Sequence, residues 1–207
     1  MSAVMPLASL LDARQVWRGR AMPVPTGDQP TGWPTLDAVL PTGGWPAASL
    51  SEILLPTDGV GELRVVLPTL ARLTQAGQSV VVVAPPYTPY VTGWRQHGVD
   101  MRRVELVAAK DTDVLWATEQ CLRSGSCAAV LAWSMQADAG ALRRLQVAAD
   151  TGKALAFLFR DRKHLPNASP APLRLELEAQ PHHQLWVRKC RGGAVPVRPI
   201  PLTFALH

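Results

Sequence analysis

The stretch EILLPTDGVGEL, Glu52–Leu63, decides the fold class of this chain of 207 residues. Its first residues continue an apolar run that begins at Ser49, and the segment PTDGVG that follows has the composition of a tight turn. Apolar residues then recur at helical spacing from Glu62 to Gln75. The stretch therefore predicts a strand, a glycine-containing loop and an amphipathic helix.

The same layout is typical of phosphate-binding loops of the pattern G-x-x-x-x-G-K-[ST]. In such loops backbone N–H groups surround a phosphate, and the lysine reaches the β and γ phosphates. Here Gly59 and Gly61 are followed by Glu62 and Leu63 in place of the lysine and the hydroxyl residue. A carboxylate in the first turn of a helix stabilises that helix and repels an incoming phosphate. We therefore interpret Gly59, Gly61, Glu62 and Leu63 as a degenerate P-loop that binds no nucleotide cofactor.

The other groups that ATP hydrolysis by this route needs are also missing. The strand 79–84 ends at Pro85 and Pro86, where a water-activating glutamate would be expected, and the strand 127–133 ends at Trp133, where a magnesium-binding aspartate would be expected. Arg64 is two residues into the helix, so its side chain is expected to point away from the loop, and Pro68 removes one hydrogen bond within that helix. We expect no catalytic residue, no metal site and no enzymatic activity.

Strand and helix patterns alternate through the middle of the chain, which favours a mainly parallel sheet covered by helices on both faces. Several of the strands are apolar on both faces, as buried parallel strands are. The expected strands are 49–55, 79–84, 104–108, 127–133 and 154–159, and the expected helices are 62–75, 88–97, 111–123 and 138–150.

The pattern changes after residue 165. Apolar and charged residues alternate over 173–177 and again over 184–188, which predicts a half-exposed antiparallel hairpin at the sheet edge. His182 and His183 fall in its turn and are interpreted as solvated, and the Gly- and Pro-containing end of the chain is expected to be extended or partly disordered. We expect three parts: an N-terminal helix and proline-rich tether (1–34), an α/β core (35–164), and a C-terminal basic hairpin and tail (165–207).

The charge of the chain is uneven. The formal net charge is +5, yet the residues from Ala141 onward contain 11 basic and 4 acidic side chains. This excess suggests an acidic partner, either a phosphate backbone or an acidic protein face, although a solvated surface is also compatible. One aromatic among several cations could contact single-stranded nucleic acid, and an extended segment could equally dock on a protein. The candidate contact residues are Val16, Trp17, Arg18, Trp186, Arg188, Lys189, Arg191 and Arg198.

The composition also indicates where the protein is located and argues against some kinds of metal or disulfide site. No apolar run is long enough to span a bilayer, and the N-terminus lacks the pattern of a secretory signal, so a cytoplasmic location without membrane contact is expected. Cys121, Cys127 and Cys190 have no metal-binding spacing, which argues against structural zinc and against a disulfide framework.

Several short motifs occur in a characteristic order along the chain. They are Leu67-Pro68, Pro85-Pro86, GWRQHGVD (93–100), CLRSG (121–125), the strand ending in Trp133, and AFLFRD (156–161). From Thr31 to Trp133 the chain is similar to a RecA-type core, and with these motifs it resembles the RecA-like family of ImuA and the cell-division inhibitor SulA more closely. The segments 16–20 (VWRGR) and 188–193 (RKCRGG) resemble ImuA rather than SulA.

This resemblance implies a non-catalytic accessory factor of the damage-inducible (SOS) translesion synthesis mutasome. The implied partners are ImuB, which is an inactive relative of Y-family polymerases, and RecA, with an error-prone C-family polymerase as an indirect partner. The implied location is the cytoplasm, with association to the nucleoid on DNA damage. A SulA-like inhibitor of the division GTPase FtsZ, a sequence-nonspecific DNA-binding module and a cryptic ATPase stay open as alternatives.

Overall fold

The computed structural model describes residues 29–110, 113–134, 136–180 and 182–202. Helical and strand segments alternate as the sequence predicts. The helices are α2 (Pro34–Asp37), α3 (Glu62–Gln75), α4 (Val91–Gln96), α5 (Asp113–Arg123) and α6 (Ala139–Gly152), with 3-10 turns η1 (Met101–Arg103) and η2 (Arg162–His164). The strands are β1 (Leu50–Leu55), β2 (Val80–Val83), β3 (Val104–Val107), β4 (Ala129–Trp133), β5 (Leu155–Asp161), β6 (Leu173–Glu178), β7 (Gln184–Cys190) and β8 (Ile200–Pro201).

The strands form one sheet of eight in the order β3-β2-β4-β5-β1-β6-β7-β8. The strands from β3 to β6 in this order pair in parallel, while β7 and β8 add to the sheet in antiparallel pairs. Parallel strands need crossover connections that cover the sheet, which explains why helices separate most of them. The chain is thus a mixed α/β protein with a mainly parallel sheet and a C-terminal antiparallel hairpin, as predicted.

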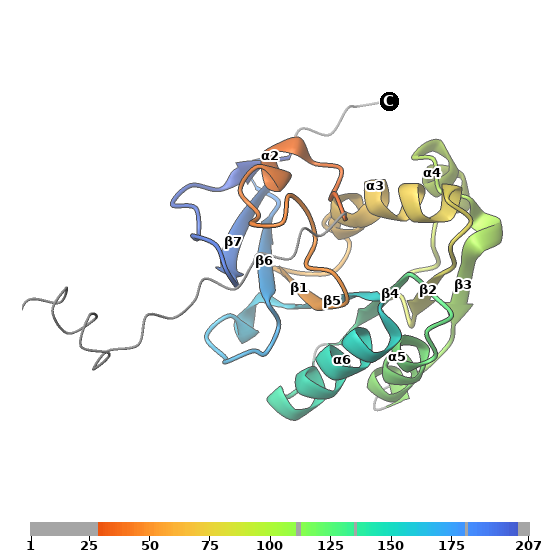
Figure 1. Ribbon diagram of the computed structural model, residues 1–207. Coiled ribbons are helices and arrows are strands. Elements are labelled where there is room, and N and C mark those ends of the chain that lie inside the picture. Colours follow the sequence, from red (N-terminus) through yellow and green to blue (C-terminus); the bar gives the residue numbers. More distant parts are fainter. Residues whose placement is uncertain (1–28, 111–112, 135, 181, 203–207) are drawn as a thin grey trace, which may run out of the picture.

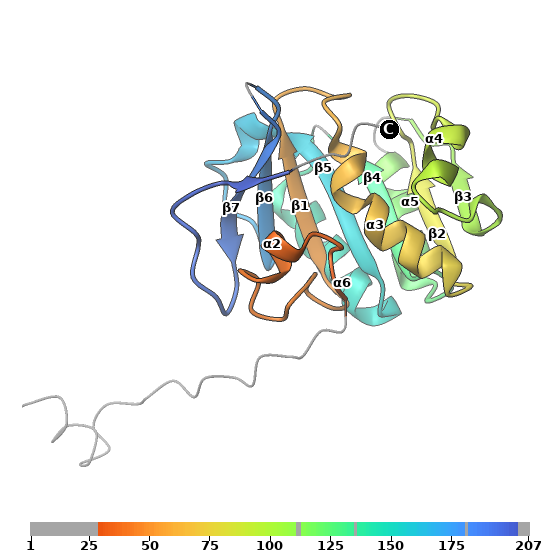
Figure 2. The ribbon, with the colours of Figure 1, turned by 90° about the horizontal axis from the view of Figure 1, so that it is seen from above.

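Helices cover both faces of this sheet. Figure 1 shows α2, α3 and α4 on one side and α5 and α6 on the other, and Figure 2 shows α3 crossing the near side of the strands. The two faces have separate hydrophobic cores, with Phe157 and Phe159 in the first and Leu158 in the second. Successive residues of a strand point to opposite faces, so β5 supplies both cores.

The segment before β1 packs on α3. The Trp33 indole Nε1–H donates to the Val65 carbonyl at 3.0 Å, and the buried Trp45 Nε1–H donates to Thr69 Oγ1 at 2.8 Å. The α-carbon of Gly32 lies so close to Pro68 that an added Cβ would be 2.3 Å from the proline Cβ. Helix α3 continues through Pro68 from Glu62 to Gln75.

Two expectations need correction. The helix expected over 88–97 begins only at Val91, because Pro89 precedes its N-cap residue Tyr90 and disfavours helical backbone before it. The hairpin is less exposed than predicted, because β6 pairs with β1 as well as β7 and most of its residues are buried. The C-terminal end, which was expected to be extended or partly disordered, is extended at strand β8, and Ile200 and Leu202 are buried.

Within the described part of the chain, no helix is both long enough and apolar enough to cross a membrane.

Candidate functional site

The loop that follows β1 lies where two chain paths diverge at the carboxyl edge of the sheet. From β1 the chain crosses the first face through α3 and continues to β2. From β5, which pairs with one side of β1, the chain continues to β6, which pairs with the other side of β1. Ala171 lies in the connection between β5 and β6 and packs in the second core. Ligands of open α/β sheets bind where such loops diverge. Loop 56–61 therefore occupies the position at which this fold would place a ligand.

The backbone of this loop depends on its two predicted glycines. Gly59 has a φ of 79° and Gly61, the N-cap residue of α3, has a φ of 91°. Other residues rarely adopt this left-handed region, which explains why glycine is needed at both positions. The Glu62 side chain is buried, and its Oε1 accepts a hydrogen bond from the Gly59 N–H at 3.3 Å. A backbone donor that could face an anion is thus used by the protein's own carboxylate.

Two further carboxylates surround the same loop. Asp161 ends β5 directly opposite Leu55, the last residue of β1. Burial, together with the negative charges of Glu62 and Asp161, raises the pKa of Asp58 above its ordinary value. The backbone N–H of Lys163 donates to Asp161 at 2.8 Å, and this bond lowers the pKa of Asp161. We call Asp58, Glu62 and Asp161 the carboxylate cluster; its negative charges repel an incoming phosphate, and the charge of Asp161 is in part balanced by Lys163 Nζ at 3.2 Å.

The side chains of the carboxylate cluster are not arranged as the ligands of a metal ion. Among the residues that the structure describes, no set of three or more His, Cys, Asp or Glu side chains is arranged to hold a metal ion.

The turn of the C-terminal hairpin lies against this loop, which the sequence did not predict. His183 Nε2 lies 3.1 Å from the Val60 carbonyl oxygen, and an added Cβ on Gly61 would lie 3.6 Å from the same nitrogen. The interpretation of both histidines as solvated is therefore wrong for His183, although His182 is exposed. The reason is that β6 pairs directly with β1, which brings the end of the hairpin beside the loop that follows β1.

Trp133 and the proline pair end their strands as predicted. The Trp133 ring is buried and stacks on Phe159 with 4.6 Å between ring centroids, which places an apolar pair next to the loop edge of the sheet. After β2, Pro85 and Pro86 lead to Tyr87, and a Cβ added at Gly59 would lie 3.4 Å from the ring of this tyrosine. Arg64 is exposed on α3, with its Cδ on the side of Gly61.

Two residues of the basic hairpin are already engaged by carboxylates. Trp186 Nε1–H donates to Glu178 at 3.0 Å, and Arg188 Nε–H donates to Glu176 at 2.7 Å while its guanidinium lies 4.6 Å from the Trp186 ring centroid. The hydrogen bonds from Trp186 and Gln184 lower the pKa of Glu178. These contacts reduce the capacity of Trp186 and Arg188 to bind a phosphate backbone.

The remaining candidate contact residues lie apart from the loop site. Lys189 donates to the Ser169 carbonyl at 2.6 Å, whereas Arg191 and Arg198 are exposed. The structure thus brings Trp186 and Arg188 together but does not bring the basic residues into the carboxylate cluster. The other predicted contact residues, Val16, Trp17 and Arg18, lie outside the described residues.

A buried charge network holds β1, β5 and β6 together, and sequence reasoning missed it. Glu52 Oε2 lies 2.6 Å from Arg160 Nη1, its Oε1 lies 3.4 Å from Arg174 Nε, and Ser169 donates to the same Oε1. All three charged side chains are buried. The available signal was Glu52 and Arg160 within strands that otherwise consist mainly of apolar residues, because charges rarely enter a core unpaired. Arg174 gave no such signal, because it belongs to the alternating pattern of β6.

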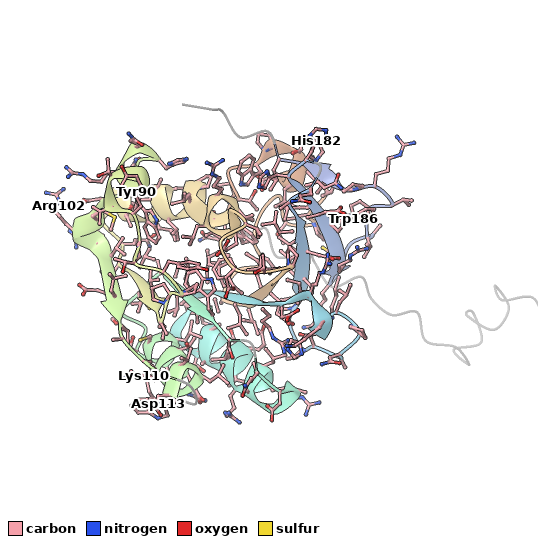
Figure 3. The ribbon with its side chains drawn as sticks, turned by 180° about the vertical axis from the view of Figure 1, so that it is seen from behind. Tyr90, Arg102, Lys110, Asp113, His182 and Trp186 are labelled. Atoms are coloured by element: carbon pink, nitrogen blue, oxygen red, sulfur yellow. The ribbon has the colours of Figure 1, made fainter. Side chains whose placement is uncertain are left out.

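Apolar side chains are exposed on two surfaces. Tyr87 and Tyr90 are 65% and 71% exposed and, with Val91, form what we call the tyrosine surface. Leu106 and Trp116 are 54% and 65% exposed and flank strand β3 from opposite faces of the sheet, since Leu106 points to the side of Val104 and the first core while α5 packs on the second core. We call these two side chains together with the outer side of β3 the edge surface. In the edge surface, Trp116 of α5 lines a hollow of about 560 Å³ beside β3. Figure 3 shows Tyr90 at the end of the molecule opposite His182 and Trp186.

The edge surface includes an unpaired strand. Among the described strands β3 pairs with β2 alone, so the backbone N–H and C=O groups on its outer side are available. A free edge strand beside exposed apolar side chains can take up an extended segment of another protein.

No protein-family model and no curated protein matches this chain. Among solved structures it is similar to the crystal structure of SulA from Pseudomonas aeruginosa, with 29% sequence identity and a TM-score of 0.47. The likeness covers 56% of this chain and 98% of that chain.

Proposed function

We propose that this chain is a non-catalytic adaptor of SOS translesion DNA synthesis, built on a RecA-like fold whose P-loop has become a structural turn. The observation that carries the proposal is the carboxylate cluster. Glu62 stands where a P-loop has its phosphate-binding lysine, and its carboxylate accepts a hydrogen bond from the Gly59 N–H. The negative charges of Glu62 and Asp161 both act on Asp58. The motifs shared with the ImuA and SulA family supply the biological setting.

The proposal is supported by where the molecule can still bind. Because loop 56–61 has no lysine to bind a phosphate, we infer that the protein functions through its exposed surfaces and not through a nucleotide site at this loop. The edge surface offers the apolar side chains of Leu106 and Trp116 and, on the free side of β3, backbone groups that can pair with an extended segment. Both features suit a protein partner better than a phosphate backbone. We propose ImuB and RecA as the partners, with the error-prone C-family polymerase recruited indirectly.

The test is capture of partners by the full chain. Tagged wild-type protein is used as bait in extracts of DNA-damaged cells, and direct binding to purified ImuB and purified RecA is then measured. Leu106→Ser with Trp116→Ser should weaken binding to ImuB or RecA at least about tenfold if these side chains anchor the contact. Val147→Ser with Val195→Ser removes two exposed valines elsewhere and is the matched control.

The alternatives predict different outcomes. Inhibition of FtsZ polymerisation without binding to ImuB or RecA would favour the SulA-like inhibitor, which the shared motifs also allow. A DNA-binding module would bind DNA with an affinity that falls steeply as the salt concentration rises. The slope of log affinity against log salt concentration would increase with the number of phosphates contacted, because each contact releases about one counterion. Either result, without ImuB or RecA binding, would overturn the adaptor proposal.

A further inference from the structure

The tyrosine surface continues into a hollow that carries arginine side chains. The hollow has a volume of about 510 Å³, and Val91, Arg95 and Arg102 are among the residues that line it. Figure 3 shows Tyr90 and Arg102 at the same end of the molecule, away from the C-terminal hairpin. Aromatic and cationic side chains therefore gather in one region, between the loop after β2 and the 3-10 turn η1.

The two tyrosine rings lie against glycines and are otherwise mostly exposed. A Cβ added at Gly93 would lie 2.7 Å from the nearest ring atom of Tyr90, so only glycine leaves room for this ring on α4. A Cβ added at Gly59 would lie 3.4 Å from the ring of Tyr87. Pro89 between the two tyrosines fixes one backbone angle of their loop. The rings are therefore partly ordered before a ligand arrives, which lowers the entropy cost of stacking on them.

The chain around these rings carries an excess of positive charge. Residues 84–104 include Arg95, Arg102 and Arg103, all exposed, and a single acidic residue, Asp100. Arg102 Nη2 lies 2.9 Å from Asp100 Oδ2, so this pair is neutral as a whole. Arg95 and Arg103 form no ion pair with any residue that the structure describes. Two guanidinium groups are thus available to an anionic ligand beside the tyrosine surface.

Carboxylates lie at both ends of this positive region. Asp58 of the carboxylate cluster is the neighbour of Gly59, beyond the Tyr87 ring, and Glu105 is exposed on β3, directly after the arginines. Their negative charges direct an anionic ligand away from loop 56–61 and from the edge surface. The ligand is therefore expected over Tyr90 and the hollow.

Exposed aromatic rings beside free cations favour a nucleic acid over an acidic protein face. Every base has a π-face that stacks on an aromatic side chain, while the phosphates contact arginine, and such stacking requires bases that are not paired in a duplex. The carboxylates of an acidic protein would use the arginines alone. The C-terminal hairpin is a weaker candidate for the same ligand, because Trp186 and Arg188 already contact carboxylates there.

We propose that the tyrosine surface and the adjoining hollow bind single-stranded nucleic acid without sequence preference. Bases stack on Tyr87 and Tyr90, and phosphates contact Arg95 and Arg103. This inference does not depend on the adaptor function, because the tyrosine surface is separate from the edge surface at which a protein partner is proposed. A chain that binds ImuB or RecA can bind a single strand at the same time.

Fluorescence anisotropy with the full chain and a labelled thymidine oligonucleotide of about 20 nucleotides tests the stacking. Tyr87→Ala with Tyr90→Ala should weaken binding at least about tenfold, because each base that stacks contributes to affinity. Trp116→Ala removes an equally exposed aromatic side chain from the edge surface and should leave the affinity unchanged. Failure of the wild-type chain to bind at low salt, or wild-type affinity in the double tyrosine variant, would overturn the proposal.

The salt dependence of the same binding tests the role of the arginines. Arg95→Gln with Arg103→Gln should reduce the slope of log affinity against log salt concentration by about 1.4, since a single strand releases about 0.7 counterions for each phosphate contact. Arg191→Gln with Arg198→Gln removes the same charge from the exposed C-terminal segment and should leave the slope unchanged. The reverse result would place the ligand at the C-terminal segment and disprove the assignment.

Two competing ligands separate stacking from simple attraction between charges. Poly-glutamate and a DNA duplex, each of the same length as the oligonucleotide, should bind at least about fivefold more weakly than the single strand, because neither offers unpaired bases. Equal affinity for poly-glutamate would assign the surface to an acidic protein face. Equal affinity for the duplex would show that the rings take no part in binding. Either result contradicts the proposal.

Discussion

Arg160 Nη1 lies 2.6 Å from Glu52 Oε2 in the interior of the protein, and the two side chains are 2% and 0% exposed. The contact joins adjacent parallel strands, and Arg160 Nη2 also donates to the Ala137 carbonyl at 2.6 Å. Because Glu52 also contacts Arg174 of β6, one carboxylate links three strands. Strand β1 is therefore tied to both of its neighbours and, through Ser169, to the connection between β5 and β6.

Removing the charge of Glu52 should destabilise the protein strongly. Glu52→Gln keeps the side-chain shape but leaves two buried guanidinium groups without a counter-charge, so we expect a loss of about 3–5 kcal/mol in the free energy of unfolding. Urea unfolding followed by circular dichroism measures it. Asp150→Asn breaks the exposed pair with Lys153 and should cost no more than about 1 kcal/mol. Equal effects of the two changes would contradict the central role of Glu52.

Gly152 allows α6 to approach α5 closely. A Cβ at this position would lie 1.8 Å from the Leu122 carbonyl oxygen, so Gly152→Ala must displace one helix end. We expect a loss of about 1–3 kcal/mol in unfolding free energy, as for other overpacked sites.

Gly140→Ala is the control within the same helix. The nearest atom to its Cβ would be Asp138 Oδ1 at 3.4 Å, and alanine is favoured over glycine in a helix by about 1 kcal/mol. The two alanine variants should therefore shift the thermal midpoint in opposite directions. A stabilising Gly152→Ala change would show that the helices are not in close contact there.

Asp58 should make stability depend on pH. Burial and the neighbouring carboxylates raise its pKa above 3.8, so the folded state favours the protonated form. This contribution is complete below pH 3.8 and is lost as the pH rises through the folded-state pKa. Asp58→Asn, which mimics the neutral form, should be more stable than wild type at pH 7, and the difference should shrink toward pH 4.

Urea midpoints at several pH values between 4 and 7 measure this effect. Asp113→Asn removes an exposed carboxylate from α5 and is the matched change of charge. If Asp58→Asn is less stable than wild type at pH 7, the carboxylate is held by favourable contacts instead, and the repulsive carboxylate cluster is disproved.

Nucleotides should not stabilise the protein. With Glu62 in the loop and Asp58 and Asp161 beside it, we expect ATP and ADP with Mg²⁺ at about 1 mM to shift the thermal midpoint by less than about 1 °C. Differential scanning fluorimetry over a range of nucleotide concentrations makes the measurement. A midpoint that rises with nucleotide concentration would revive the cryptic ATPase alternative.

The sequence by itself determined the order of the main elements and the sheet class. Apolar runs in β2, β4 and β5 required a sheet covered on both faces, and glycine at positions 59 and 61 required a turn before α3, because these features depend on local periodicity and backbone freedom. The absence of Lys at position 62 was likewise readable directly.

Only the tertiary structure decided which distant residues meet. Pairing of β6 with β1 brings His183 to the Val60 carbonyl and Arg174 to Glu52, and the path from β5 places Asp161 beside the loop. These contacts depend on strand order and register, which local propensity does not specify. The sequence shows that the loop lacks the lysine of a P-loop. The strand order shows in addition that carboxylates lie around this loop and that the turn of the C-terminal hairpin contacts it.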